Sequence, residues 1–239
     1  SPNIVFILTD DLAYADLSSY GSEYITTPNI DKMANDGVKL TSYYAAQAVC
    51  SASRAAILTG CYPNRLGISG AFGPNSKKGI NPNELLLSEM LKNNDYKTGI
   101  FGKWHLGDAE KFMPTNHGFD EFYGILFSND MWPYHPEFPS AYPEDLLLYR
   151  NTEPVEALID QSDLTKNITD ESIRFIDENK DNQFFLYIAH PQPHVPLFAS
   201  KEFDGSTGKG LFADVITEID FSVGRIIDAL EKNGLSKNT

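Results

Sequence analysis

The chain has 239 residues, of which 41% are hydrophobic, and its formal net charge is −14. This composition is typical of a folded globular protein and excludes a disordered or fibrous chain. No apolar run approaches the roughly 20 residues that a membrane-spanning helix needs. The acidic excess also argues against nucleic acid as a partner, because a phosphate backbone is bound mainly through Lys and Arg. An anionic substrate therefore requires a local cluster of cations that outweighs the global charge.

The apolar spacing predicts alternating strands and helices along the chain. Residues 3–9 form a continuous apolar, β-branched run, which predicts a strand buried on both faces. A helix follows over residues 29–36, with Pro28 in its first turn and Gly37 at its end. Further helices are predicted over residues 51–59, 83–94, 163–179 and 212–232, and further strands over residues 38–44, 96–101 and 184–189. In the helix over 83–94, the residues expected to face inward are Leu85, Leu86, Met90 and Leu91.

This alternation predicts an α/β fold with a mostly parallel central sheet flanked by helices, and a functional site beyond the carboxyl ends of the strands. Residues 128–154 are rich in Pro, Tyr and Trp and lack periodicity, which predicts a long surface loop. Two interpretations of its aromatic residues stay open: Trp132 and Tyr134 stack on a sugar ring, or the loop packs on its own domain. A further buried strand is expected after the last helix, so the domain is interpreted as incomplete.

Asp10 and Asp11 directly follow the first predicted strand. Adjacent carboxylates repel each other and are best tolerated beside a cation, and their hard oxygen atoms suit Ca²⁺ or Mg²⁺. The position of the two residues after a strand also allows a second interpretation, in which both carboxylates are solvated and cap the following turn. The other acidic residues considered are expected on solvated helix faces; they are Asp31, Asp36, Glu218 and Asp220.

Cys50 precedes the predicted helix over residues 51–59, where backbone N–H groups and the helix dipole favour anions. Arg54 lies one turn further along, near the same face. Together they predict a small anion-binding pocket with a nucleophile and a guanidinium. The alternative is that Cys50 is a buried small hydrophobic residue. The other cysteine is Cys61, and two cysteines are too few for a disulfide framework.

Two further loops carry candidate cations. Lys103 and His105 follow the strand over 96–101, and His194 follows the strand over 184–189 in a proline-rich loop. Residues two apart in an extended loop point the same way, so Lys103 and His105 can meet one anion, the first as a charge and the second as an acid. Taken alone, Lys103 and His105 are better interpreted as a surface lysine and a packed histidine. The alternative for the His194 loop is a rigid turn without a catalytic role. His117, in a turn-like stretch, is interpreted as structural.

Four loops, each placed after a predicted strand, therefore carry an acidic pair, a Cys with an Arg, a Lys with a His, and a second His. If they converge, they place a metal and several cationic donors around one nucleophile. That combination suits a tetrahedral oxyanion ester, and it explains how an acidic protein holds an anion. The residues by themselves indicate a metal-assisted sulfuryl or phosphoryl ester hydrolase.

Five segments resemble the type I, formylglycine-dependent sulfatases of the alkaline phosphatase-like superfamily. They are PNIVFILTDD at 2–11, CSASR with LTG at 50–60, GKWHLG at 102–107, NHGFD at 116–120 and HVP at 194–196. They occur in the family's order and extend over most of the chain. The segments SNDMWP at 128–133 and HVPLFAS at 194–200 are most similar to the arylsulfatase A and N-acetylgalactosamine-6-sulfatase branch. The resemblance implies that residues 1–239 are the N-terminal part of a catalytic sulfatase domain.

The resemblance also implies a role for each matching residue around the nucleophile. Cys50 would be oxidised by a formylglycine-generating maturation enzyme to Cα-formylglycine, whose hydrated aldehyde supplies the attacking hydroxyl. The second hydroxyl of the hydrate would then release sulfate without attack of water on sulfur. Arg54 would hold the hydrate in place, and His105 would orient it and help to expel sulfate.

The remaining matches concern the metal and the substrate. Asp10 and Asp11 would bind Ca²⁺, or Mg²⁺, in contact with the sulfate. Lys103 and His194 would bind the sulfate and protonate the leaving oxygen between them. The implied substrate is a sulfated sugar or an aryl sulfate, and the implied compartment is the periplasm, the lysosome or the extracellular space.

The sequence departs from the family pattern in two places. Ala52 stands where the family commonly has Pro, which leaves open which maturation enzyme would accept the segment. Nothing in the chain matches the family's later Asp-Asn or Asp-His metal pair or its later sulfate-binding Lys. Because Ca²⁺ usually takes 6–8 oxygen ligands, we expect weak or no activity from residues 1–239 alone.

Three alternative functions remain at this stage. A phosphonate or phosphate ester hydrolase of the same superfamily would use the same cysteine-derived diol. A non-catalytic binding domain would keep the fold without formylglycine or a complete metal site. A cysteine hydrolase pairing Cys50 with His105 or His194 would be inactivated by thiol alkylation and would not respond to chelators.

Overall fold

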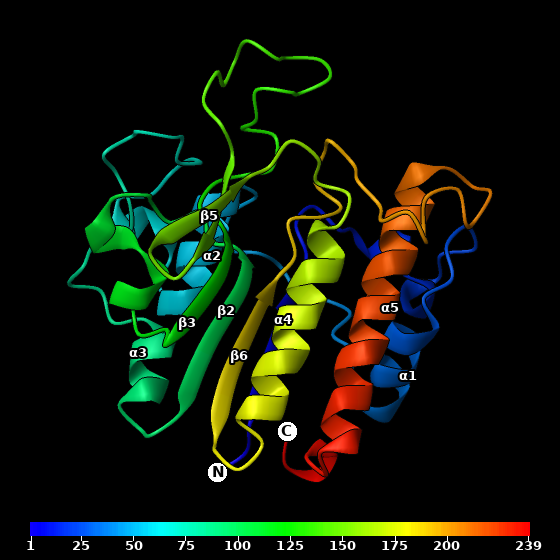
Figure 1. The fold of residues 1–239 in the computed structure, drawn as a ribbon. Coiled ribbons are helices and arrows are strands. Elements are labelled where there is room, and N and C mark those ends of the chain that lie inside the picture. The colour runs from blue at the N-terminus through cyan, green and yellow to red at the C-terminus, as the bar shows by residue number, and fades with distance from the viewer.

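Parallel apolar strands form the centre of the fold in the computed structural model, which describes residues 1–239 (Figure 1). The six strands of the sheet are β1 (Ile4–Leu8), β2 (Lys97–Lys103), β3 (Glu121–Ile125), β4 (Leu147–Arg150), β5 (Glu153–Ala157) and β6 (Phe184–Ala189). Their order in the sheet is β1-β6-β2-β3-β4-β5. Strands β1, β6, β2 and β3 are mutually parallel. Strand β4 pairs antiparallel with β3, and β5 pairs antiparallel with β4. The predicted α/β fold with a mostly parallel sheet is confirmed.

Helices cover both faces of this sheet. They are α1 (Pro28–Asp36), α2 (Cys50–Thr59), α3 (Leu87–Lys92), α4 (Leu164–Glu178) and α5 (Leu211–Lys232). Side chains alternate between the two faces along a strand, so Phe184 and Leu186 of β6 pack in one core with α4 and α5. Phe185 and Tyr187 pack in the other core with residues of α2. In Figure 1, α4 lies in front of the sheet, and α5 lies to the right of α4 and beside α1.

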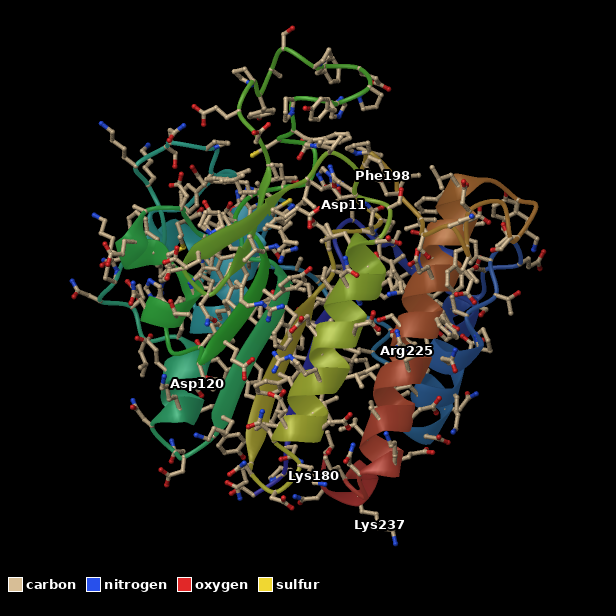
Figure 2. The ribbon with its side chains drawn as sticks, in the orientation of Figure 1. Asp11, Asp120, Lys180, Phe198, Arg225 and Lys237 are labelled. Atoms are coloured by element: carbon tan, nitrogen blue, oxygen red, sulfur yellow. The ribbon has the colours of Figure 1, made fainter.

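The carboxyl ends of the parallel strands meet at one edge of the sheet, where the polar loops begin. Asp11 and Phe198 lie at this edge, and Lys180 and Lys237 lie at the opposite end of the molecule (Figure 2). The connections at this edge therefore bring together residues that are far apart in the chain, as expected for an open parallel sheet.

Two predicted elements differ from the structure. Residues 38–44 form no strand; they are exposed and lie in bends, because no neighbouring strand is available to pair with them. The helix predicted over 83–94 is confined to Leu87–Lys92, and Leu85 and Met90 face solvent rather than the core. The strand prediction was wrong, whereas the helix prediction was right in part, since Leu86 is buried and Leu91 packs against the core as expected. The misses arose because apolar residues at a favourable spacing do not ensure a partner surface.

The predicted loop over residues 128–154 is also partly wrong. It contains β4 and the start of β5, which sequence periodicity did not indicate. Trp132 is buried, and its indole nitrogen donates to the carbonyl oxygen of Leu158 at 2.6 Å. Of the two interpretations of the aromatic residues, packing of Trp132 on its own domain is the one that the structure supports.

Three acidic residues of α5 are buried: Asp214, Glu218 and Asp220. The prediction of solvated positions for Glu218 and Asp220 was therefore wrong. Asp220 accepts hydrogen bonds from the backbone nitrogens of Asn29 and Ile30 at 3.0 and 2.9 Å, and so caps the first turn of α1.

None of the helices combines the length and the apolar composition that crossing a bilayer requires.

Candidate active site

Asp10 lies at the centre of a group of polar side chains at the carboxyl edge of the sheet. Its Oδ2 atom accepts a hydrogen bond from Lys103 Nζ and lies 3.6 Å from Arg54 Nη2. Burial disfavours the charged form of Asp10, but the charges of Arg54 and Lys103 outweigh this effect and hold its pKa at about 2. The carboxylate is therefore ionised at neutral pH, and two buried cations share it.

Cys50 is the first residue of α2, and its Sγ lies 3.8 Å from Asp10 Oδ2. Residues 38–49 form an irregular connection between α1 and α2 rather than a strand. This connection brings Cys50 to the carboxyl ends of the parallel strands. The expectation that the Cys50 loop follows a strand was therefore wrong, although the thiol still lies beside Asp10. Burial raises the pKa of the Cys50 thiol, and this opposes its use as an ordinary thiolate nucleophile.

Arg54 and Lys103 form a buried cationic wall beside Cys50. Arg54 Nη1 donates to the carbonyl oxygen of Lys103 at 2.6 Å, so the guanidinium and the last residue of β2 fix each other. Arg54 Nη2 is buried and makes no hydrogen bond. A buried donor without a partner leaves a place for an acceptor such as a ligand oxygen.

His194 and Asp11 lie on the outer side of this group. His194 Nε2 is 3.7 Å from Asp11 Oδ2. His194 Nδ1 lies 2.6 Å from the carbonyl oxygen of Val195, which can only accept, so Nδ1 carries a proton. Nε2 is therefore the ring nitrogen that remains available to a ligand.

His105 is placed differently from the prediction of an extended Lys103–His105 loop. Its backbone has a φ of 59°, in the left-handed region, so its side chain does not simply repeat the direction of Lys103. His105 Nε2 lies 2.8 Å from the carbonyl oxygen of Phe72 and must carry the proton. Burial and the nearby charge of Lys103 lower the pKa of His105 to about 3. The ring is therefore neutral, and its buried, unpartnered Nδ1 is an acceptor.

Ser128 is a contact of the site that the sequence did not single out. It follows β3, and its Oγ accepts from Lys103 Nζ at 2.8 Å. Ser128 begins the segment SNDMWP that resembles a sulfatase branch, but β3 was not predicted, so nothing placed this residue beside Lys103. His117, interpreted as structural, is buried beside Trp104 and lies 3.2 Å from the carbonyl oxygen of Lys111.

The site opens into a cleft of about 760 Å³. Asp10, Asp11, Cys50 and Arg54 line it, together with apolar residues of the connection between α1 and α2. The cleft is large enough for a small organic ligand. The candidate nucleophile therefore faces an accessible space.

The acidic pair fits one side of a divalent metal site. All of the side-chain contacts of Asp10 are made by Oδ2, which leaves Oδ1 without a protein donor. The side chain of Asp11 is 67% exposed. These carboxylate oxygens are the hard donors that Ca²⁺ or Mg²⁺ prefers, although they are fewer than a full shell requires. Asp10, Cys50 and His194 also each place one donor atom within 4.8 Å of the others.

Comparison with known protein families places the chain in one family. The sulfatase family model matches residues 2–239. The chain belongs to the sulfatase family. The segments with Asp10, Cys50, Lys103 and His194, which resemble sulfatase motifs, are the ones that the fold brings to one edge of its sheet.

Individual relatives of this sulfatase-family chain are similar over its whole length. N-acetylgalactosamine-6-sulfatase of Rattus norvegicus is 38% identical and arylsulfatase A of Bos taurus is 36% identical, with 100% of this chain covered in both. The match covers 48% and 50% of those proteins, so the chain spans about half the length of these curated relatives. The crystal structure of Ps i-CgsB is 33% identical, with a TM-score of 0.88 over 100% of this chain and 56% of that one. A complex of Ps i-CgsB with k-i-k-neocarrahexaose gives a TM-score of 0.84.

Proposed function

We propose that this chain belongs to a sulfuric ester hydrolase that removes sulfate from a sulfated carbohydrate or an aryl sulfate. The observation that carries the proposal is the placement of Cys50 Sγ 3.8 Å from Asp10 Oδ2, which Lys103 and Arg54 also contact. Two buried cations beside one buried carboxylate leave a positive pocket in a chain of net charge −14. Such a pocket suits an anionic ester.

Cys50 is proposed to act after conversion to Cα-formylglycine rather than as a thiolate. The raised pKa of the thiol supports this choice, since the thiolate is the reactive form of cysteine. The hydrated aldehyde supplies a hydroxyl nucleophile and a second hydroxyl. When this second hydroxyl loses its proton, the bond between the carbon and the sulfate oxygen breaks, so the aldehyde reforms and sulfate leaves. The neutral His105 ring presents Nδ1 as an acceptor that can orient a hydroxyl proton, and Arg54 Nη2 offers an unused donor.

Lys103 and His194 are proposed to handle the sulfate and the leaving oxygen. Lys103 is fixed by Asp10 and Ser128, so its ammonium group has a set position without conformational freedom. His194 holds one proton on Nδ1 through Val195 and can deliver a second from Nε2 to the leaving oxygen.

Asp10 and Asp11 are proposed to hold Ca²⁺, with Mg²⁺ as the other suitable ion. The metal would supply positive charge to the sulfate oxygens in the transition state. Because the chain spans about half the length of its curated relatives, residues 1–239 are proposed as the N-terminal part of the catalytic domain. Weak or no turnover is expected from these residues alone.

A carbohydrate substrate is the favoured class. The solved complex of the similar Ps i-CgsB contains k-i-k-neocarrahexaose, and one of the curated relatives is an N-acetylgalactosamine-6-sulfatase. The cleft of about 760 Å³ next to Cys50 provides room for a sugar ring.

Mass spectrometry of the peptide that contains Cys50 tests the proposal most directly. After coexpression with a formylglycine-generating enzyme, the aldehyde mass is expected at Cys50 and an unmodified thiol at Cys61. Chelation should then weaken binding of an aryl sulfate, and Arg54→Ala should weaken it further. An intact Cys50 thiol together with inactivation by thiol alkylation would instead support a cysteine hydrolase, and preference for an aryl phosphonate would support the phosphonate ester alternative.

A further inference from the structure

A second polar cavity lies between α4, α5 and the loop over residues 200–203, separate from the Cys50 site. Its volume is about 320 Å³. Hydroxyl and carboxyl groups from both helices and the loop line it, including those of Thr165, Thr169, Ser200, Glu202, Glu218 and Ser222. Helix α5 contributes Arg225 to the same wall (Figure 2). None of the groups assigned to the proposed sulfatase chemistry lines this cavity.

Glu218 is the unusual member of the cavity wall. The residue is 3% exposed, and its Oε2 accepts from the backbone nitrogen of Ser200 at 2.9 Å. Its Oε1 is buried and has no hydrogen-bond partner. Burial raises the pKa of Glu218, as expected for a carboxyl group that lacks enough donors. A buried acceptor of this kind is stabilised by a ligand that donates a hydrogen bond.

Both cations beside the cavity are paired with the carboxylate of Asp170. Asp170 accepts from Lys166 Nζ at 2.9 Å and from Arg225 Nη1 at 2.7 Å. Glu202 and Glu218 add two further carboxyl groups to the wall. No cation is left unpaired in the lining, so a sulfate or phosphate group would meet repulsion rather than attraction.

The remaining wall offers fixed hydroxyl groups and an aromatic surface. The Oγ of Ser222 lies 2.6 Å from Thr169 Oγ1 and 3.2 Å from His190 Nε2, so the hydroxyl groups are held by a buried network. The rings of Phe203 and Phe221 lie 5.3 Å apart, and Phe221 is 45% exposed. Aromatic rings beside hydroxyl and carboxylate acceptors suit a molecule with an apolar face and several O–H donors.

We propose that this cavity binds a neutral polyhydroxylated ligand of the size of one sugar ring. An O–H group of the ligand donates to Glu218 Oε1, other hydroxyls meet the Thr and Ser side chains, and the C–H face of the ring lies against Phe221. Binding at this surface does not require conversion of Cys50 or a metal at Asp10. The inference therefore stands or fails independently of the proposed sulfatase chemistry.

Titration of the ¹⁵N-labelled chain with D-galactose tests the proposal by NMR. Saturable shifts of the Ser200 amide, which donates to Glu218, and of neighbouring cavity amides are expected, with a Kd on the order of millimolar. Glu218→Gln should weaken binding at least tenfold, whereas Glu231→Gln, an exposed glutamate of the same helix, should leave the Kd unchanged. Phe221→Ala should also weaken binding, with the exposed Phe138→Ala as its matched control.

Inorganic sulfate and ethylammonium serve as comparison ligands in the same titration. The proposal is overturned if D-galactose leaves the Ser200 amide unshifted, if either ion shifts it and the sugar does not, or if Glu218→Gln binds like the parent chain. Far-ultraviolet circular dichroism establishes that each variant is folded. If Glu218→Gln fails that check, the comparison of Phe221→Ala with Phe138→Ala still decides the outcome.

Discussion

Asp10 alone balances two buried cations, Arg54 and Lys103. Asp10→Asn would leave both positive charges without a counter-charge in a buried environment. We expect a loss of about 3–5 kcal/mol in the free energy of unfolding, since removing one partner of a buried ion pair strands the other. Urea unfolding followed by circular dichroism measures this loss.

The neighbouring Asp11 provides the matched control for that substitution. Its side chain is 67% exposed, and its Oδ2 lies 3.7 Å from His194 Nε2. Asp11→Asn should therefore change the free energy of unfolding by less than about 0.5 kcal/mol. Equal losses for the two variants would show that Asp10 is not the residue that holds the cationic wall together.

We expect His190 to account for part of the loss of folding stability of the chain at acidic pH. Burial lowers its pKa to about 4, against an ordinary value of 6.5. Between these values the unfolded chain binds a proton that the folded chain does not, so stability falls as the pH falls from 6.5 to 4. In His190→Gln, the slope of unfolding free energy against pH should be shallower by up to about 1.4 kcal/mol per pH unit in this window.

The pH range above 7 is the internal control for the comparison of the parent chain with His190→Gln. Neither the folded nor the unfolded chain protonates this ring there, so the slopes of the two proteins should coincide. Chemical unfolding at a series of pH values measures both ranges. An unchanged slope between pH 6.5 and 4 in His190→Gln would contradict the assignment.

The residues of the candidate site that could be predicted from the sequence are those that lie at the ends of predicted strands. Asp10, Lys103 and His194 lie at or beyond the carboxyl ends of buried strands, and parallel strands bring those ends together. Ser128 was not found because its contact with Lys103 depends on β3, which the periodicity did not reveal. The contact of His105 with the carbonyl oxygen of Phe72 was also unpredictable, since any residue provides such an oxygen.

At the scale of elements, Asp220 links α5 to the start of α1. Its carboxylate accepts from the backbone nitrogens of Asn29 and Ile30, whereas Thr27 at the N-cap position makes no side-chain cap. Asp220→Ala should lower the free energy of unfolding by about 1–3 kcal/mol, because it removes a cap and leaves buried N–H groups without acceptors. Thermal or urea unfolding measures the loss.

Asp228 of the same helix is the control for Asp220. It is exposed, so Asp228→Ala should leave the unfolding midpoint nearly unchanged. A variant at Asp220 that is as stable as the one at Asp228 would show that the cap does not hold α1 on α5.

Elements with a strong, one-sided pattern were predicted well, and those that depend on distant partners were not. Strand β6 consists entirely of apolar, buried residues, and α4 and α5 have clear apolar faces. By contrast, β5 is exposed and has the sequence EPVEA, so only its pairing with β4 makes it a strand. The burial of Glu218 and Asp220 was missed for the same reason, since their partners lie on other elements.

At the scale of the whole molecule, the two outermost strands of the sheet, β1 and β5, differ in how they are protected from pairing with another chain. The β5 edge carries Pro154 and two glutamates, which discourage pairing with another strand. At the other edge, β1 pairs only with β6, and its five residues, IVFIL, are apolar and half-buried. An apolar unprotected edge strand is a template for association.

We therefore expect the chain to self-associate through β1, and to do so more strongly at high salt. The net charge of −14 repels a second copy at low ionic strength, whereas about 1 M salt reduces the screening length to roughly 3 Å. Sedimentation velocity over a range of concentrations should show association that Val5→Lys suppresses and Val155→Lys, on the protected β5 edge, does not. Association that weakens with salt, or that both substitutions suppress equally, would place the contact away from β1.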